Sequence, residues 1–398
     1  CKHDPSALIL DGLSDSLQAD DFHRVTMTTF GDAFVLSVFE TTAGVPSLSL
    51  YRAGTASSDS QLQAVADVSS LRLNAEPTSA AGLVTDALGS ALHAYAGVKE
   101  LAGARSRVHH LVFNGLLQMS SAETIPPGLV GPTTPTYDDS SPERFPIAWR
   151  VGGKVYGAWI DSDGAITGHT PGGNTMSFGD STSGKQASTL APLGSGQGTA
   201  GVAWTGLTSG IYTQLAGQGI GTLSECVGMN GFYLSSSSAA VVPGFWFLTW
   251  TKAGTGYLDS ETHQVLCDDT SAPGCVSASA CANDNISPGV RNSVSQLMQR
   301  ASEPPDWSVF ATAAPYLVPE GGNVTAVLLL SVGHHTTSGD TKTDIQLASM
   351  GTLGPLFQGP DLPALSLYAP LDKLAVAWIQ PRSGGGEELV VQRYQMCF

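Results

Sequence analysis

The stretch FPIAWRVGGKVYGAWIDSDG, residues 145–164, contains the pattern that decides the fold. An apolar run ends at Val151, the pair Gly152-Gly153 follows, and a second apolar-rich run leads to Ile160. Two strand-like runs separated by two glycines are typical of a β-hairpin. We therefore expect two antiparallel strands here, with the Asp-Ser-Asp-Gly end forming the next turn.

The same form recurs along the chain. Six further stretches combine an apolar strand, a turn and a second strand: residues 33–52, 91–115, 201–215, 244–262, 325–349 and 374–395. Their centres are roughly 45 to 57 residues apart, except for one gap of about 80, and this is the spacing of propeller blades. The sequence predicts an all-β chain, a seven-bladed β-propeller that forms one domain over residues 1–398. The alternative is a pair of tandem β-sandwiches.

The ends of the chain complete this prediction. The last hairpin leaves its blade about one strand short of the four that a propeller blade needs. The apolar run from Ala7 to Leu10 can supply that strand. We therefore expect the propeller to be closed by pairing of the N- and C-terminal strands, which hides the free edges of the sheet.

The composition limits the partners. The 398 residues include 34 acidic and 18 basic side chains, with a net charge of −16, and 42% of the chain is hydrophobic. A negative field of this size repels nucleic acid and anionic membrane surfaces, so neither is an expected partner. No run approaches the ~20 apolar residues that a membrane-spanning helix requires. Because only 13% of the residues are charged, the polar surface of this folded β-protein is expected to come mostly from Ser, Thr, Asn, Gln and Gly.

The long gap between the fifth and sixth hairpins, residues 258–307, reads as an insertion between blades that is stapled by disulfides. Within it, VRNSVSQLMQR at 290–300 predicts a short helix. An even number of cysteines favours disulfides and an oxidising compartment. The six cysteines are Cys1, Cys226, Cys267, Cys275, Cys281 and Cys397. We prefer the pairs Cys226–Cys267 and Cys275–Cys281, and a Cys1–Cys397 bond uses the remaining two.

Cys1 supports a second interpretation. The sequence begins with Cys1 followed by Lys2, and this start resembles a mature bacterial lipoprotein. That resemblance implies a lipid on Cys1, and Lys2 implies the outer membrane. A lipid on Cys1 and a Cys1–Cys397 bond exclude each other. Both place the protein outside the cytoplasm, at the cell surface or in the extracellular space, with the membrane reached only through that lipid.

Few motifs carry chemistry. Asp161 and Asp163 precede Gly164 as in the start of a calcium loop, so they are weak candidates for a calcium site; an Asp-Gly turn explains them as well. Adjacent histidines such as His109-His110 point to opposite faces of a strand, which disfavours a shared ligand set. Without HExxH or GxSxG, the sequence offers no catalytic residues, and we expect no other cofactor.

Tryptophans give the last candidates for a site. Most of them occur inside strands and are expected in the core, whereas Trp307 follows a Pro-Pro-Asp run and is the candidate for ligand binding. The sequence favours a non-catalytic scaffold or adhesion protein that binds a protein or polysaccharide through loops of one propeller face. One alternative is a secreted hydrolase or lyase with an acidic or calcium site at the channel mouth. Another is a self-associating subunit of a surface assembly or filament.

Overall fold

The structure, a computed structural model, describes residues 2–3, 7–13, 24–42, 45–56, 59, 61–67, 75–100, 106–125, 144–161, 165–173, 175–179, 187–194, 198–206, 210–222, 232–233, 237–238, 245–252, 261–268, 285–288, 294–298, 308–320, 323–336, 339–352, 363–368, 373–382 and 385–395. Every regular element within these ranges is a β-strand, so the predicted all-β class is confirmed. Among these residues, no helix is long and apolar enough to cross a membrane.

The described strands form seven antiparallel sheets, most of them four-stranded. The first comprises β3 (Val25–Phe30), β4 (Ala33–Thr42), β5 (Val45–Gly54) and β6 (Gln63–Asp67). The second comprises β7 (Ala75–Pro77), β8 (Gly82–Thr85), β9 (Leu92–Glu100), β10 (Ser106–Phe113) and β11 (Met119–Ile125). The third comprises β12 (Arg144–Val151), β13 (Lys154–Ile160), β14 (Ile166–His169) and β15 (Thr175–Phe178). The fourth comprises β16 (Ala187–Gly194), β17 (Ala200–Gly206), β18 (Gly210–Leu215) and β19 (Gly221–Thr222).

The remaining sheets come from the second half of the chain and its two ends. The fifth comprises β20 (Phe232–Tyr233), β21 (Ser237–Ser238), β22 (Phe245–Lys252), β23 (Glu261–Asp268) and β24 (Asn285–Pro288). The sixth comprises β25 (Val294–Met298), β26 (Ser308–Glu320), β27 (Asn323–Thr336) and β28 (Gly339–Thr352). The last comprises β29 (Ala364–Tyr368), β30 (Lys373–Pro381) and β31 (Glu387–Gln395), joined by β1 (Lys2–His3) and β2 (Leu8–Leu13).

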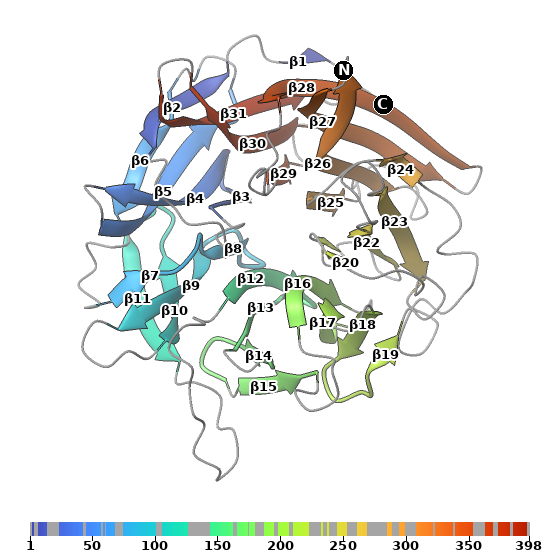
Figure 1. Ribbon diagram of the computed structural model, residues 1–398. Coiled ribbons are helices and arrows are strands. Elements are labelled where there is room, and N and C mark those ends of the chain that lie inside the picture. Colours follow the sequence, from blue (N-terminus) through green and yellow to red (C-terminus); the bar gives the residue numbers. More distant parts are fainter. Residues whose placement is uncertain are drawn as a thin grey trace.

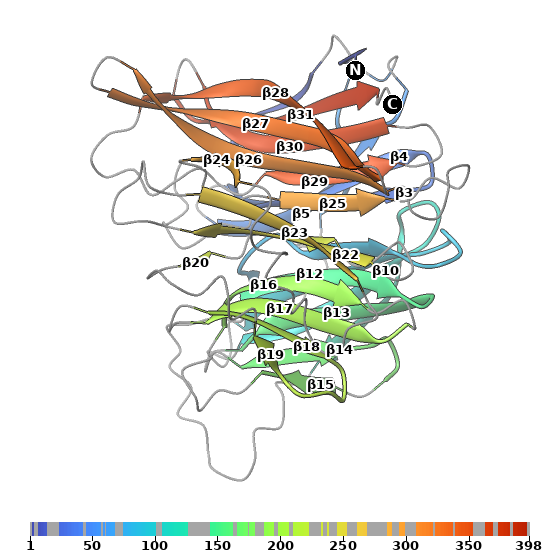
Figure 2. The same ribbon diagram turned by 90° about the vertical axis from the view of Figure 1, so that its right-hand side faces the viewer.

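The sheets lie side by side around a common centre (Figure 1), and the view turned by 90° shows strands of neighbouring sheets running alongside one another (Figure 2). Strands β3, β8, β12, β16, β21, β25 and β29 contact one another in this order, and β29 contacts β3. This radial arrangement of antiparallel sheets is that of a β-propeller.

Strands β3 and β8, which are neighbours near the centre, run in the same direction. The Thr26 hydroxyl on β3 donates to the carbonyl of Ala81, just before β8, and the Thr85 hydroxyl at the end of β8 donates to the carbonyl of Thr29. The starts of β3 and β8 are therefore neighbours, and so are their ends. It follows that the β3–β4 turn and the β8–β9 turn lie at the same end of their sheets, which we call the turn face.

The core is divided among the spaces between successive sheets. One cluster joins the first sheet to the last and contains Phe34 and Leu389. Another joins the third sheet to the fourth, where buried Trp149 stacks on Tyr156 and buried Trp204 stacks on Tyr212, with ring centroids 5.7 and 5.6 Å apart. The described tryptophan side chains belong to the core, as expected. Each sheet is stabilised by the apolar faces of its neighbours.

The predicted hairpin regions contain two successive strands that pair, except that only the first two residues of β23 fall within the region predicted at 244–262. The stretch at 145–164 forms β12 and β13, with Trp149 opposite Tyr156. Its turn residues Gly152 and Gly153 have φ of 56° and 78°. A two-residue hairpin of this kind needs positive φ at both central positions, which glycine adopts at little cost. The sheet order shows one difference between hairpins: β12–β13 pairs the first and second strands of its sheet, whereas β4–β5 pairs the second and third.

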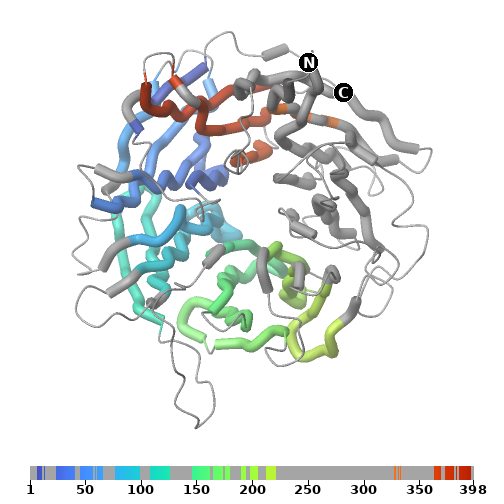
Figure 3. The backbone as a smooth tube through the Cα atoms, in the orientation of Figure 1, coloured from blue at the N-terminus to red at the C-terminus, as the bar shows by residue number. Residues whose placement is uncertain are grey.

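The beginning and the end of the described chain lie in one sheet. Strand β2 pairs with β31, with Leu8 opposite Val391, and β1 pairs with the far end of β31, with Lys2 opposite Gln395. Figure 3 shows the first and last parts of the chain, blue and red, next to each other. The apolar run near the N-terminus thus supplies the edge strand of the sheet formed by the last hairpin.

The helix predicted at 290–300 is wrong. Residues Val294–Met298 form strand β25, which pairs antiparallel with β26. A helix of this length is marginal by itself, and pairing with a long neighbouring strand outweighs a weak periodic pattern. Strands β23 and β24 also fall largely within residues 258–307 and belong to the fifth sheet. The rest of that range, including Cys275 and Cys281, lies outside the described residues, so the disulfide-stapled insertion stays a prediction.

Candidate functional site

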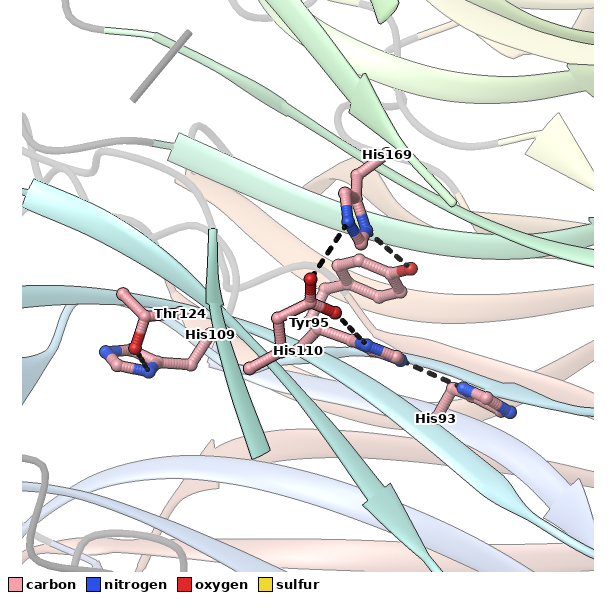
Figure 4. Close-up of polar contacts among 7 residues, drawn as sticks. His93, Tyr95, His109, His110, Thr124 and His169 are labelled. Atoms are coloured by element: carbon pink, nitrogen blue, oxygen red, sulfur yellow. Dashed lines mark hydrogen bonds and ion pairs between the residues drawn. The ribbon is translucent and has the colours of Figure 1, made fainter. Parts of the chain in front are cut away.

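A cluster of three histidines, a tyrosine and a glutamate lies between the second and third sheets (Figure 4). His93 and Tyr95 come from β9, His110 from β10 and Glu123 from β11. His169, the last residue of β14, reaches them from the third sheet. Four adjacent strands, three of them from one sheet, therefore position the group.

Strand register brings these side chains together. His110 is directly opposite Tyr95 on one side and Glu123 on the other, and cross-strand neighbours share a face of the sheet. His93 lies two residues before Tyr95 and so shares that face. His109 points the other way, where its Nδ1 lies 3.2 Å from the Thr124 hydroxyl. The expectation that His109 and His110 serve different faces is confirmed.

The polar atoms of these five side chains lie within 4 Å of one another in succession. Nδ1 of His93 lies 2.9 Å from Nε2 of His110, which is a hydrogen-bond distance. The other His110 nitrogen, Nδ1, lies 3.6 Å from Glu123 Oε2, and His169 Nε2 lies 3.8 Å from Glu123 Oε1. The Tyr95 hydroxyl lies 3.4 Å from His169 Nδ1. Glu123 thus stands between two imidazoles, one from each sheet.

The rings also pack on one another. His110 stacks between His93 and Tyr95, with ring centroids 5.2 and 4.6 Å away. Tyr95 has space because Gly157 on β13 has no side chain, since a Cβ there would come within 2.3 Å of Tyr95 Cε1. The ring of Tyr95 therefore lies directly against the backbone of the third sheet, in an apolar cluster with Trp159.

Burial favours the uncharged form of each imidazole. Burial, together with the smaller effects of the neighbouring His93 and His169, lowers the pKa of His110 to about 3. Burial also lowers the pKa of His169, although Glu123 partly opposes this, and it lowers that of His93 against the opposing charge of Asp86. The pKa of the Tyr95 hydroxyl is raised above its usual range by burial and by Glu123. Near neutral pH the rings are uncharged hydrogen-bonding groups.

Hydrogen bonds link His93 to His110 and Tyr95 to His169, and Glu123 lies close enough to two imidazoles to interact with them electrostatically. Glu123 is the member that meets solvent, because 47% of its side chain is exposed while His110 and His169 are buried. Among the residues that the structure describes, no group of three or more His, Cys, Asp or Glu side chains is arranged to hold a metal ion. The arrangement therefore points to proton-linked behaviour of the contact between two sheets.

The predicted calcium candidates lie elsewhere. The Asp161 carboxylate accepts hydrogen bonds from the Trp159 indole at 2.9 Å and from the Thr167 hydroxyl at 2.6 Å. Both of its oxygens thereby hold neighbouring strands of the third sheet together. Asp163 lies outside the described residues, so a calcium site there is untested.

The predicted cysteine and tryptophan candidates are mostly untested. Cys267 lies in β23, opposite Trp246 of β22. The other candidates lie outside the described residues: Cys1, Cys226, Cys275, Cys281, Cys397 and Trp307. Neither a disulfide nor a ligand contact is assigned to any of them.

The sequence analysis missed the histidine cluster. Its members are spread from residue 93 to residue 169, and only the register of four strands brings them together. One signal was present: His93 and Tyr95 alternate with small apolar residues on a strand, and polar residues on a buried face need partners. That pattern identifies a buried polar face without naming the partner.

Comparison with known proteins does not identify a family for this chain. No protein-family model and no curated protein matches the chain. Among solved structures, the chain is similar to BBS1N in complex with ARL6DN, with 10% identity, 97% of each chain covered and a TM-score of 0.45. It is also similar to the α-L-arabinofuranosidase Arb93A from Fusarium graminearum, with 9% identity, 98% and 97% coverage and a TM-score of 0.46. The β-propeller domain of the Trilobed protease from Pyrococcus furiosus gives 8% identity, 99% and 96% coverage and a TM-score of 0.42. Likenesses at this level carry no functional argument.

Proposed function

We propose that this protein is a non-catalytic binding module of the cell surface or extracellular space, and that it holds a protein partner on its turn face. The observation that carries the proposal is the exposure of Leu88 and Leu116, which are 88% and 79% exposed. Both lie in turns of the second sheet, Leu88 before β9 and Leu116 after β10. Leu92, which follows the first turn, pairs with Phe113, which precedes the second. The two leucines therefore project from the same end of one sheet.

Exposed leucines at the tips of turns favour an apolar contact with a partner. Met119, at the start of β11, extends the same edge and is also exposed. Arg150 and Lys154 are exposed on the third sheet, and the Arg150 side chain donates at 2.6 Å to the carbonyl of Asp86, in the same turn as Leu88. Aliphatic side chains beside cationic ones suit a protein surface with an apolar centre and acidic surroundings better than a polysaccharide, which stacks on aromatic rings.

A peptide library displayed on phage tests this function directly. Peptides selected on the wild-type protein should combine large apolar residues with acidic ones. The double variant L88S/L116S should bind them about tenfold or more weakly, as expected when central apolar contacts are lost. V45S is the matched control, because Val45 is also an exposed apolar residue but begins β5 opposite Thr42, at the end of its sheet away from the turn face. Equal affinity for all three proteins would contradict the proposal.

The enzymatic alternative is decided by a separate measurement. Purified protein is incubated with a panel of polysaccharides, with and without calcium, and the release of reducing ends is followed. The proposal expects none above a buffer control. Turnover that depends on calcium would favour the hydrolase or lyase alternative, and polymer formation in electron micrographs would favour the assembly subunit.

The architecture that we infer for this module is a closed seven-bladed propeller formed by one domain of residues 1–398. Support comes from the order in which the first strands of the sheets contact one another and return to β3, and from the pairing of β2 with β31. Polar contacts support the same closure: Arg393 on β31 donates to the carbonyls of Gly54, Ala56 and Asp59, close to the first sheet, at 2.7, 2.6 and 2.8 Å.

The chemistry of Cys1 remains a choice between two proposals. Lys2 pairs with Gln395, and Cys397 follows Gln395 by two residues, which supports a Cys1–Cys397 bond. A lipid on Cys1 is the other proposal, and it excludes that bond. Mass spectrometry of the native protein distinguishes them: an N-terminal peptide carrying a diacylglycerol establishes the anchor, and a cross-linked Cys1–Cys397 peptide rules it out.

A further inference from the structure

We propose that the cluster of His93, Tyr95, His110, Glu123 and His169 is an acid-sensitive latch between the second and third sheets. With uncharged imidazoles it holds β9 and β10 against β14, and uptake of more than one proton releases that contact. The proposal concerns the stability of one contact between sheets and does not depend on the binding function proposed above.

The hydrogen bond between the first two rings limits how many protons the cluster can hold. Nδ1 of His93 and Nε2 of His110 are 2.9 Å apart, so a single proton is shared between them. The outer nitrogens of the two rings can each carry one proton, which gives the pair one positive charge. A further proton would place two N–H groups head to head, and the bond would break.

Few charged groups can compensate for added protons. From β11, Glu123 faces Nδ1 of His110 at 3.6 Å and Nε2 of His169 at 3.8 Å. From the β8–β9 turn, Asp86 acts on His93, and its carboxylate also accepts hydrogen bonds from Ser90. The third sheet presents His169 itself, and Gly157 and Trp159 pack against Tyr95. Within the part of the chain that the structure describes, two carboxylates face three imidazoles.

The contact between the second and third sheets is sensitive to protonation because the rings of His110 and His169 are buried between these sheets. His110 and His169 have side chains only 3% exposed, and their ring centroids are 5.9 Å apart. Charging both places like charges in a desolvated space, where their repulsion is weakly screened. Glu123 can neutralise one of them while it is ionised. The second charge has no comparable partner among the described residues and pushes the sheets apart.

The direction with pH follows from the lowered pKa values. The pKa of His110 falls from 6.5 to about 3 on folding, so between these pH values the unfolded or opened state binds more protons than the folded state. Stability from this group is fully present above pH 6.5 and is lost progressively as the pH falls toward 3. The lowered pKa values of His93 and His169 act in the same direction.

Two measurements on the wild-type protein test the latch without any substitution. NMR of the imidazole Cε1 protons should show that the His110 ring stays neutral at pH 5.5, and that the pKa values of His93 and His169 lie below that of an ordinary imidazole. Hydrogen exchange, corrected for its intrinsic pH dependence, should show that amides of β9, β10 and β14 open about tenfold or more readily at pH 5 than at pH 7, whereas β4 and β5 change little. Imidazoles that titrate near 6.5, or uniform opening of all sheets, would overturn the proposal.

Substitutions separate the latch from a general effect of histidines. H110Q removes the central titrating ring, so it should lower Tm at pH 7.5 and make the fall in Tm between pH 7.5 and 5 clearly shallower than in wild type. H109Q is the matched control on the same strand, since His109 is buried on the opposite face and contacts Thr124. It should leave the pH-dependent opening of β14 as in wild type, because His109 faces away from the third sheet. An unchanged slope in H110Q would refute the latch, and if that variant does not fold, the wild-type NMR and exchange results decide.

Discussion

Arg24 and Glu387 form an ion pair, with Arg24 Nη1 only 2.5 Å from Glu387 Oε2, although the two residues are 363 positions apart. Arg24 immediately precedes β3, and Glu387 begins β31. The pair lies where the first sheet meets the last. Together with the β2–β31 pairing, it marks the junction between the first and last sheets.

The two neighbours Leu8 and Ile9 test that junction. Leu8 is fully buried and Ile9 is 52% exposed, yet both lie on β2 and pair with β31. We expect L8A to lower the free energy of unfolding by about 3 kcal/mol, because it leaves a cavity between two sheets. I9A should cost less than about 1 kcal/mol, because little apolar contact is lost. Urea denaturation of both variants measures the difference, and equal losses would argue against β2 as part of the core.

Arg393 gives an independent test of the same junction. Its guanidinium is buried and donates to three backbone carbonyls near the end of β5. R393M keeps much of the aliphatic volume but leaves those carbonyls without their donor, so we expect a loss of about 2–4 kcal/mol in unfolding free energy. R382M is the control, because Arg382 is exposed and its substitution should cost less than about 0.5 kcal/mol. A similar loss in both variants would show that the buried contacts contribute little.

Substitutions at Gly152 and Gly153 distinguish the energetic cost of a positive φ from the cost of a steric clash. Both have positive φ, but a Cβ on Gly152 would lie 2.8 Å from Gly198 Cα, whereas the nearest atom for Gly153 is Ala87 Cβ at 3.9 Å. G153A should therefore cost about 1 kcal/mol, from the conformation alone. G152A should cost at least about 1 kcal/mol more, because the fourth sheet approaches there. Thermal unfolding compares the two, and equal Tm values would mean that this close approach does not constrain the turn.

Gly157 tests the packing behind the histidine cluster. G157A would drive a methyl group into the ring of Tyr95, and we expect a loss of about 1–3 kcal/mol. Because the clash requires that ring, G157A should cost much less in a Y95A background, and a double-mutant cycle measures this coupling. G115A is the control, since a Cβ on Gly115 meets no atom within 4 Å. An additive cycle would contradict direct contact between Tyr95 and Gly157.

The strands and their pairing within hairpins could be predicted from the sequence, because their signals are local. Alternating side chains and a Gly-Gly turn determine β12–β13 without reference to the rest of the chain. The apolar run Ala7–Leu10 could be recognised as a missing edge strand for the same reason, and it lies largely within β2 (Leu8–Leu13). The helix expected at 290–300 failed where a weak local pattern competed with pairing to β26, a contact that the sequence does not reveal.

The histidine cluster depends on relationships that no local pattern contains. Alternation alone determined that His109 and His110 face opposite sides of β10. That His110 meets His93 and Glu123 depends on the register of three strands, and that His169 joins them depends on the packing of one sheet on the next. By itself, the sequence determined where the chain forms strands, because backbone and turn preferences act over a few residues. Only the tertiary structure decided which buried polar groups meet, because desolvation and the resulting pKa changes arise from neighbours that are distant in the chain.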